Sequence, residues 1–296
     1  ICISTTDDEY ANMIFEILPS IKYSSLTGTL EYPNQDYILS ESLPGKNTDD
    51  AYYWQNAFSI SMIEFDTKHL HLDFGSSVVF PKRFELGYLF PLTNYVEYQN
   101  HIGDYDNLAL FGDIKLRKAN FGELWASLYL DELNGLRNNP ITSSRAMFAG
   151  QIGAKSVFPW LSFGSVALRY TKVEPFCYTH HSINYVPYYS DYVCENYSNN
   201  GYNIGSYLPP NSDEILLRFD ATPHKNIDTS FQYQMIRHGA DYGSQQVRGS
   251  SIYSELDNQL RSGMKKYFLH DGAYEWTHIL SCSANSFSRS AKLPFR

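Results

Sequence analysis

The 296-residue chain has no stretch of about 18 consecutive apolar residues, which a membrane-spanning helix would need. Charged residues are also scarce, at 19%, and the net charge of −9 comes with no basic stripe, so no nucleic-acid partner is expected. The motifs G-x-S-x-G, H-E-x-x-H, G-x-G-x-x-G and the P-loop are missing. The sequence therefore gives no support to the common hydrolase, zinc-protease or nucleotide-binding chemistries.

Cysteine is rare as well, with four residues and no C-x-x-C pair, so neither a structural zinc site nor any other cofactor is expected. Cys177 and Cys194 flank a long polar segment. A disulfide between them and two free thiols both remain open. His69 and His71 would share one face of a strand, but the sequence shows no third metal ligand, so ordinary polar-face histidines are the preferred interpretation.

What the chain does have is a period of two in polarity, which is typical of β-strands with two unlike faces. Leu168 and Tyr170, for example, oppose Arg169 and Thr171. In the same way the apolar set containing Phe58 is predicted to face outward, away from a polar interior. Helical periodicity is weak, near residues 10–17 and 252–260. The alternating segments are 57–65, 69–74, 106–119, 124–133, 163–172, 214–221 and 230–235.

Short breakers such as FPW (158–160) and TPHKN (222–226) contrast with a long, tyrosine-rich segment at 180–213. Short turns and long polar loops are typical of outer-membrane β-barrels, whose long loops face outside. We therefore predict an all-β fold, an antiparallel transmembrane outer-membrane β-barrel of about 10 to 12 strands. It would form a single domain over residues 1–296, with 180–213 as an extracellular loop. A soluble sandwich or lipocalin-like barrel is the alternative.

Aromatic residues make up 16% of the chain, with 25 Tyr, 18 Phe and 4 Trp. Many fall at the ends of predicted strands, where a membrane barrel carries its interfacial girdles. The expected girdle residues are Tyr88, Phe90, Trp125, Tyr129, Phe158, Trp160, Tyr170, Phe176 and Tyr178.

Two patterns of charged residues resemble catalytic motifs, but neither supports a catalytic interpretation. Asp131 and Glu132 are neighbours on a predicted strand, so their side chains point to opposite faces and cannot share a substrate. The tripeptide at 237–239 (RHG) is found in histidine acid phosphatases but has no partner motif here. Arg117, Arg169 and Arg218 fall on the predicted wet face, where they bind acidic polysaccharide or, by preference, pair with Asp113, Asp131 and Asp220. No enzymatic activity is predicted.

Tyrosine faces stack on sugar rings while Asn and Asp bind hydroxyls, so the tyrosines of 180–213, among them Tyr188, Tyr192 and Tyr202, are candidate polysaccharide ligands. The alternative is a loop that folds on itself and plugs the barrel.

Four segments in order, "YDNLALFGDIKLRKANFGELWASLYLDELN", "LRYTKVEPFCYTH", "NNGYNIGSYLPPNSDEILLRF" and "YQMIRHGADYG", resemble the Wzi-type capsule-assembly outer-membrane β-barrel family in its spirochaete and Bacteroidetes-like branch. The resemblance covers roughly residues 58–280. It implies a monomer in the bacterial outer membrane, in contact with outer-membrane lipid. It also implies lectin-like, non-catalytic binding of surface or capsular polysaccharide. The candidate binding residues that it adds are Asp131, Arg169, Tyr178, His180, Asn211, Asp213, Arg237 and His238.

The family's barrels have more strands than this chain suggests, so the N-terminal part of the barrel is expected to be missing. This expectation agrees with a chain that begins at Ile1 without a signal peptide and loses alternation in its last residues. Two other functions stay open: an outer-membrane porin or solute transporter of the same architecture, and a membrane-embedded hydrolase. For the hydrolase, the check is a Ser or Asp beside a His on the wet face.

Overall fold

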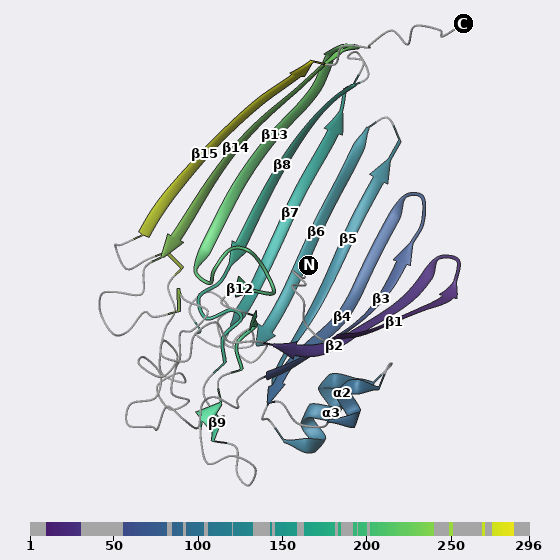
Figure 1. Cartoon of the computed structure of the whole chain (residues 1–296), viewed down its shortest axis with the longest axis vertical. Coiled ribbons are helices and arrows are strands. Elements are labelled where there is room, and N and C mark those ends of the chain that lie inside the picture. The colour runs from purple at the N-terminus through teal and green to yellow at the C-terminus, as the bar shows by residue number, and fades with distance from the viewer. Residues whose placement is uncertain are drawn as a thin grey trace, which may run out of the picture.

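A computed structural model describes residues 10–30, 56–81, 85–90, 93–103, 106–119, 121–132, 143, 146–158, 163–180, 183–184, 192–193, 195–199, 202–239, 249–250, 268–269 and 274–286. These residues form an eleven-stranded sheet in which every neighbouring pair is antiparallel (Figure 1). Its strands, in spatial order, are β1 (Tyr10–Leu18), β2 (Ile21–Leu30), β3 (Asn56–Asp66), β4 (Leu70–Pro81), β5 (Asn107–Lys118), β6 (Gly122–Glu132), β7 (Met147–Val157), β8 (Phe163–Val173), β13 (Ser212–His224), β14 (Ile227–Gly239) and β15 (Tyr274–Ser286).

The all-β antiparallel prediction is confirmed, and the eleven strands lie within the expected number. The weak helical pattern at 10–17 was wrong, because these residues form β1. The second weak pattern, at 252–260, lies outside the described residues. The remaining elements are small: the hairpins β9 (Ile183–Asn184) with β10 (Tyr192–Val193) and β11 (Ser198–Asn199) with β12 (Tyr202–Asn203), and the helices α2 (Leu86–Leu89) and α3 (Tyr95–Ile102).

The connections between strands differ at the two ends of the sheet. At one end, which we call the turn end, successive strands are joined by very short links, such as the two residues 225–226 between β13 and β14. At the other, the loop end, the links are long and include 174–211 between β8 and β13. This asymmetry follows the predicted alternation of short turns and long loops.

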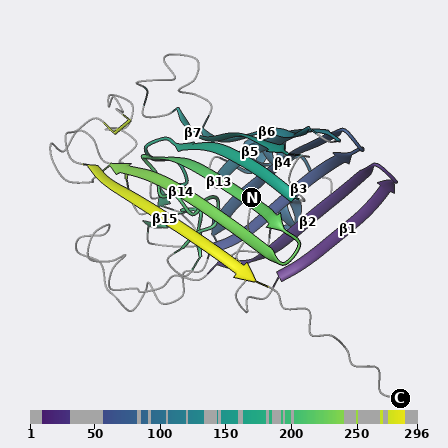
Figure 2. The same ribbon diagram turned by 90° about the horizontal axis from the view of Figure 1, so that it is seen from above.

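The sheet is curved but not closed. Figure 2 shows it curling round, so that the edge strands β1 and β15 both lie toward the same side of the view. Within the described residues each of them pairs with only one neighbour, β2 and β14 respectively. The structure therefore shows a curved antiparallel sheet rather than a complete barrel.

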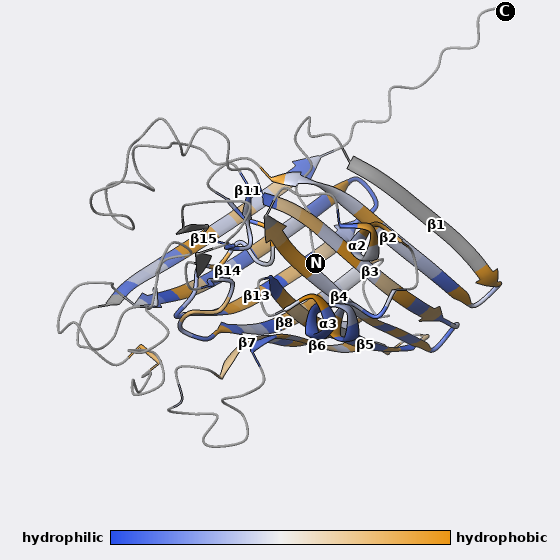
Figure 3. Cartoon of the chain, turned by 90° about the horizontal axis from the view of Figure 1, so that it is seen from below, coloured by the Kyte–Doolittle hydropathy of each residue, from blue (hydrophilic) through white to orange (hydrophobic). Residues whose placement is uncertain are grey.

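The two faces of the sheet differ in chemistry, and hydrophobic and hydrophilic residues alternate along the strands (Figure 3). The first face, called here the apolar face, carries large hydrophobic side chains that are exposed, Leu168 for instance by 54%. The second, called the polar face, carries Asp113, Gln151 and Arg169. Exposed members of the apolar face are Ile63, Leu72, Phe74, Ile114, Leu116, Leu124, Leu128, Ile152, Leu168, Ile215, Phe219, Phe231 and Leu280.

The predicted faces of β4, β5, β6, β8, β13 and β14 are therefore correct, but the prediction for β3 was inverted. Phe58 and its neighbours Ile60 and Met62 lie on the polar face, in the core that packs there. Ser59 and Ser61 take the apolar face and are buried. Alternation identified the strand, but the elements that cover each face decide which set is inside.

At the loop end, the described residues of segment 174–211, called here the plug segment, pack on the polar face and form the main hydrophobic core with it. Tyr197 is central: its ring meets Phe58 and Tyr129 edge to face, with centroids 6.1 and 5.8 Å apart. Its hydroxyl donates to the backbone carbonyl oxygens of Ser77 at 2.9 Å and Asn107 at 3.0 Å. Burial raises the pKa of Tyr197 well above its usual value. The alternative of a loop folded onto the polar face is thus the arrangement observed for the described part of 180–213.

The helices α2 and α3 cover the opposite, apolar face at the loop ends of β2 to β5. Tyr88 and Tyr95 pack there with Phe80 and Val78. Asn94 caps α3, its side chain accepting from the backbone N–H of Glu97. Neither described helix is long and apolar enough to cross a membrane.

Four of the expected girdle aromatics are buried rather than exposed on the apolar face, which corrects that prediction. Tyr88, in α2, is buried against the apolar face, and Tyr129, Phe176 and Tyr178 are buried on the polar side. Tyr170 does lie on the apolar face, 37% exposed. Trp160 lies outside the described residues. Cys194 does too, so the question of a disulfide between Cys194 and the buried Cys177 also falls outside them.

Candidate functional site

The polar face holds a cavity of about 410 Å³ between the plugged loop end and the turn end. This volume lies within the usual range of small-molecule sites. The cavity is bordered by strands β4 to β8, which place aromatic, acidic, basic and amide side chains around it. Its lining is His71, Asp73, Asp113, Ile114, Lys115, Glu123, Trp125, Ser127, Gln151 and Arg169.

Trp125 provides the aromatic surface of this cavity because a glycine lies opposite it. Gly153 is its cross-strand partner on β7, and a Cβ there would lie 2.1 Å from Trp125 Cζ2. The indole can therefore lie directly against the backbone of β7. Its Nε1 donates to Gln151 Oε1 at 3.0 Å, which fixes the ring plane.

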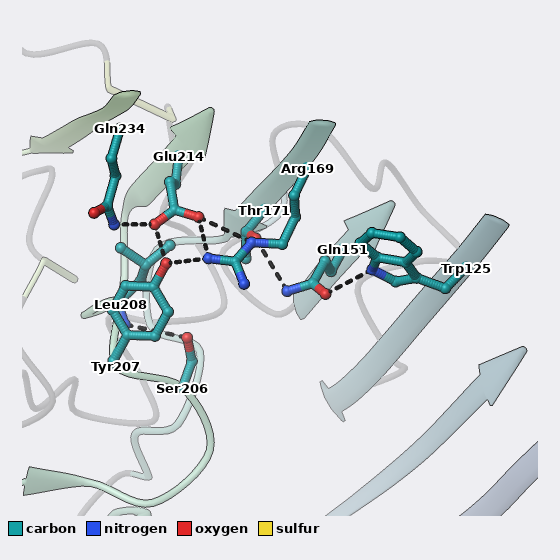
Figure 4. A network of polar contacts seen from close by, with 9 residues as sticks. All are labelled: Trp125, Gln151, Arg169, Thr171, Ser206, Tyr207, Leu208, Glu214 and Gln234. Atoms are coloured by element: carbon teal, nitrogen blue, oxygen red, sulfur yellow. Dashed lines mark hydrogen bonds and ion pairs between the residues drawn. The ribbon is translucent and has the colours of Figure 1, made fainter. Parts of the chain in front are cut away.

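Figure 4 shows this contact and, farther across the sheet, a second set of polar contacts that reaches the plug segment. Gln151 Nε2 donates to Thr171 Oγ1 at 3.2 Å. Arg169 binds Glu214 Oε1 through Nε at 3.2 Å and Nη2 at 2.7 Å, and the same Nη2 donates to the Tyr207 hydroxyl at 2.8 Å. Tyr207, which belongs to the plug segment, also donates to Glu214 Oε2. The network fastens the plug to β8 and β13 beside the cavity.

A second polar set is not satisfied internally. Asp73 and Asp113 are direct cross-strand partners on the polar face, and like charges in this position are destabilising. The side chain of Asp113 makes no hydrogen bond or ion pair within the part of the chain that the structure describes, and the same holds for the side chains of Lys115 and Glu123. The cavity thus presents uncommitted acceptors and donors next to an aromatic ring.

The check for a hydrolase finds an Asp beside a His, but not a catalytic triad. His71 Nε2 lies 3.0 Å from Asp73 Oδ2, and Nδ1 lies 3.3 Å from Asp66 Oδ1. Since both ring nitrogens face carboxylates, neither is positioned to take a proton from a serine hydroxyl.

Arg117, Arg169 and Arg218 form ion pairs, which is the interpretation preferred from the sequence, but not all with the expected partners. Arg218 Nε binds Asp220 Oδ2 at 2.8 Å, which is one of the expected acids but lies two residues along the same strand rather than across the sheet. Arg169 pairs instead with Glu214, which the register of β8 against β13 places near it, and Arg117 pairs with Asp66. Asp131 serves another purpose: its Oδ2 accepts the backbone N–H of Tyr178 at 2.6 Å.

That contact belongs to a turn with an unusual backbone. Phe176 and Tyr178 have φ of 65° and 72°, a region that non-glycine residues rarely adopt. The carboxylate of Asp131 and the carbonyl of Gly249, which accepts the Phe176 N–H at 3.0 Å, hold the turn in place. Both residues therefore shape the entry of the plug segment.

Most of the predicted binding residues turn out to organise the loop end rather than line the cavity. Asn211 Nδ2 donates to Ser250 Oγ and its Oδ1 accepts from Leu269 N, both at 2.9 Å, while Arg237 binds the buried Asp213. Tyr202 is 75% exposed and away from this network. Two other contacts tie backbone to side chain: His238 Nε2 lies 2.9 Å from Ser250 O, and His180 N donates to Asn196 Oδ1 at 3.1 Å.

Among the predicted binding residues, Arg169 borders the cavity. Asp131, Tyr178, Asn211 and Asp213 are buried. Tyr188 and the side chain of Tyr192 lie outside the described residues.

The sequence did contain a signal for the residue that was missed. Trp125 is in phase with Glu123 and Ser127, the polar set of its strand, and so could not belong to an outward girdle. An aromatic residue on a polar face marks a surface that a ligand can share.

No family model matches the chain, and no curated protein or solved structure is significantly similar to it. The resemblance to Wzi-type proteins therefore stays a prediction.

Proposed function

We propose that the chain is a lectin-like, non-catalytic outer-membrane β-barrel protein that binds surface polysaccharide and assists capsule or exopolysaccharide assembly or attachment. The observation that carries the proposal is a single sheet with an exposed apolar face and, opposite it, a cavity lined by Trp125 and uncommitted charged groups.

The apolar face supports insertion in a membrane. Its exposed hydrophobic side chains lie on every strand of the main sheet from β3 to β15, and water-soluble monomers rarely expose so broad an apolar surface. Nine of the eleven strands of the described sheet have 11 to 13 residues. Such strands extend about 37–44 Å at about 3.4 Å per residue, or roughly 26–31 Å along the membrane normal at a tilt of about 45°. That length matches a hydrocarbon core of about 30 Å.

The cavity supports saccharide binding. A sugar ring presents an apolar C–H face and a rim of hydroxyls, and here an indole held flat on Gly153 lies beside Asp113, Lys115 and Gln151. The indole would stack on the C–H face while the polar side chains bind hydroxyls. Sugar hydroxyls would donate to both Asp73 and Asp113, and the Asp113 side chain has no donor within the described residues.

The plug favours binding over passage. The described residues of the plug segment pack on the polar face at the loop end, with Tyr178, Tyr197 and Leu208 almost fully buried. A diffusion porin needs this route open. In liposome swelling, we expect no passage of oligosaccharides, and rapid swelling would favour the porin alternative.

A glycan array of neutral and acidic bacterial polysaccharides, followed by titration of any ligand found, tests the function. Trp125→Ala should weaken binding by about tenfold or more, about 1.4 kcal/mol. The matched control is Trp276→Ala, on the apolar face and 49% exposed, which should leave binding unchanged. Equal loss in both variants, or no binding to any polysaccharide, would remove the proposal.

A further inference from the structure

Basic side chains gather around a second cavity, at the turn end of β4 to β7. It has a volume of about 350 Å³ and is lined by Lys68, His69, Arg117, Lys118, Ala119, Gly122, Glu123, Lys155 and Val157. Three different links or strands supply the cations: the β3–β4 turn, the end of β5, and β7. The lining contains four lysine or arginine side chains and a single acid.

The fold does not neutralise this charge internally. Glu123 lies in register between Arg117 and Lys155, but its side chain forms no ion pair with either of them within the described residues. Arg117 is also bound by Asp66 at 3.2 Å. Within the part of the chain that the structure describes, Lys68, Lys118 and Lys155 form no ion pair. Asp220, which lies toward Lys155, is held by Arg218 Nε at 2.8 Å.

Backbone geometry keeps the basic groups together. Gly122 has a φ of 136°, and a Cβ there would lie 1.8 Å from the carbonyl oxygen of Lys155. Only glycine allows β6 to begin so close to β7. His69 Nδ1 lies 3.2 Å from the carbonyl oxygen of Arg117, which joins the β3–β4 turn to β5.

Large apolar side chains border the same corner. Phe121, Leu116 and Leu124 are 66%, 49% and 54% exposed, and the Lys118 ammonium lies 5.8 Å from the Phe121 ring centre. Leu116 and Leu124 are cross-strand partners on the apolar face. Arg117 and Lys155 belong to the polar face, so cations and hydrocarbon-like surface meet at the turn-end rim of the sheet, where Lys118 contacts Phe121. This is the environment of a lipid headgroup region.

We propose that the turn-end cavity binds the phosphate of an anionic phospholipid, with Lys118 and Lys155 as its principal contacts. A phosphate accepts hydrogen bonds from several donors at once. It also supplies the negative charge that Lys68, Lys118 and Lys155 do not find within the described residues. The lipid assignment rests on the proposed membrane insertion, whereas the anion site does not.

The test uses the full chain, purified in a neutral detergent, with phosphatidylglycerol and phosphatidylcholine offered together and the retained lipid counted by native mass spectrometry. We expect wild type to prefer phosphatidylglycerol by roughly tenfold, and Lys118→Glu with Lys155→Glu to abolish the preference. The matched control is Lys22→Glu with Lys225→Glu, two exposed turn-end lysines outside the cavity, which should keep it. If the reversed variant does not fold, Lys118→Ala with Lys155→Ala replaces it.

An unchanged preference in the cavity variant, or an equal loss in the control, would overturn the proposal. Release of the lipid by an equal concentration of inorganic phosphate would show that the site takes the free ion, and would overturn the assignment to a lipid. Flotation with phosphatidylcholine vesicles separates the two hypotheses. A protein that fails to float contradicts membrane insertion, and phosphate titration of that protein still tests the cavity.

Discussion

The ion pair between Arg169 and Glu214 allows a prediction with an internal asymmetry. Glu214 is completely buried, whereas the Arg169 side chain is 25% exposed. Arg169→Met leaves a buried carboxylate with only Gln234 and Tyr207 as donors, so we expect it to lower the free energy of unfolding by about 3 kcal/mol. Glu214→Gln leaves a guanidinium that water can reach, and should cost only about 1–2 kcal/mol.

Urea unfolding in detergent micelles, followed by circular dichroism of the sheet, measures both values. The double variant should cost less than the sum of the single ones, with a coupling of about 1.5–3 kcal/mol. Arg218→Met provides the control, because its pair with Asp220 is more exposed, at 52% and 25%, and should be worth less than about 1 kcal/mol. An equal cost for the two single variants, or strict additivity, would refute the argument from burial.

Three further predictions follow from single contacts. Gly153→Ala places a Cβ 2.1 Å from Trp125 Cζ2, so titration should show about tenfold weaker saccharide binding, and unchanged binding would contradict the flat indole. Tyr197→Phe removes the hydroxyl that binds two backbone carbonyls and should lower the unfolding free energy by about 1–2 kcal/mol in the same urea assay. Burial, helped by Tyr23, raises the pKa of Tyr95 to about 12, above about 10 in the unfolded chain. Tyr95 therefore loses its proton at a lower pH in the unfolded chain than in the folded one. The contribution of Tyr95 to the free energy of unfolding should be complete below about pH 10 and fall between about pH 10 and 12, and an ultraviolet titration should show a tyrosine that ionises late.

The strands and their faces could be predicted because side chains alternate between the two faces of a strand. A shift of one residue would move the whole hydrophobic set to the other face, so the polarity pattern of the sequence decides which residues share a face. Leu168 and Arg169 could only belong to opposite faces, and the structure agrees. Which acid would pair with Arg169 was not predictable. Glu214 is 45 residues away and reaches it only through the register of β8 against β13, in which Arg169 pairs with Leu216 and Thr171 with Glu214.

The helices were missed although part of their signal is present. Asn94 followed by Glu97 is the beginning of a capping box, and the structure uses Asn94 as the cap of α3. An eight-residue helix has too little periodicity to stand out in a chain where alternation of two dominates. α2 has four residues and no side-chain cap, so it depends on packing against the sheet.

The wrong prediction of the faces of β3 and the failure to predict helix α3 have the same physical cause. Ser59 and Ser61 face the apolar side, where hydrocarbon could not satisfy their hydroxyls. The Tyr95 hydroxyl of α3 lies among them and Ser25, and the cover leaves all three serines buried. Beyond this cover the exposed hydrophobic residues begin, with Ile63 next along β3. If the apolar face contacts lipid, α3 marks the level at which the hydrocarbon ends on this side of the sheet. The serines are then evidence for a boundary rather than against a membrane.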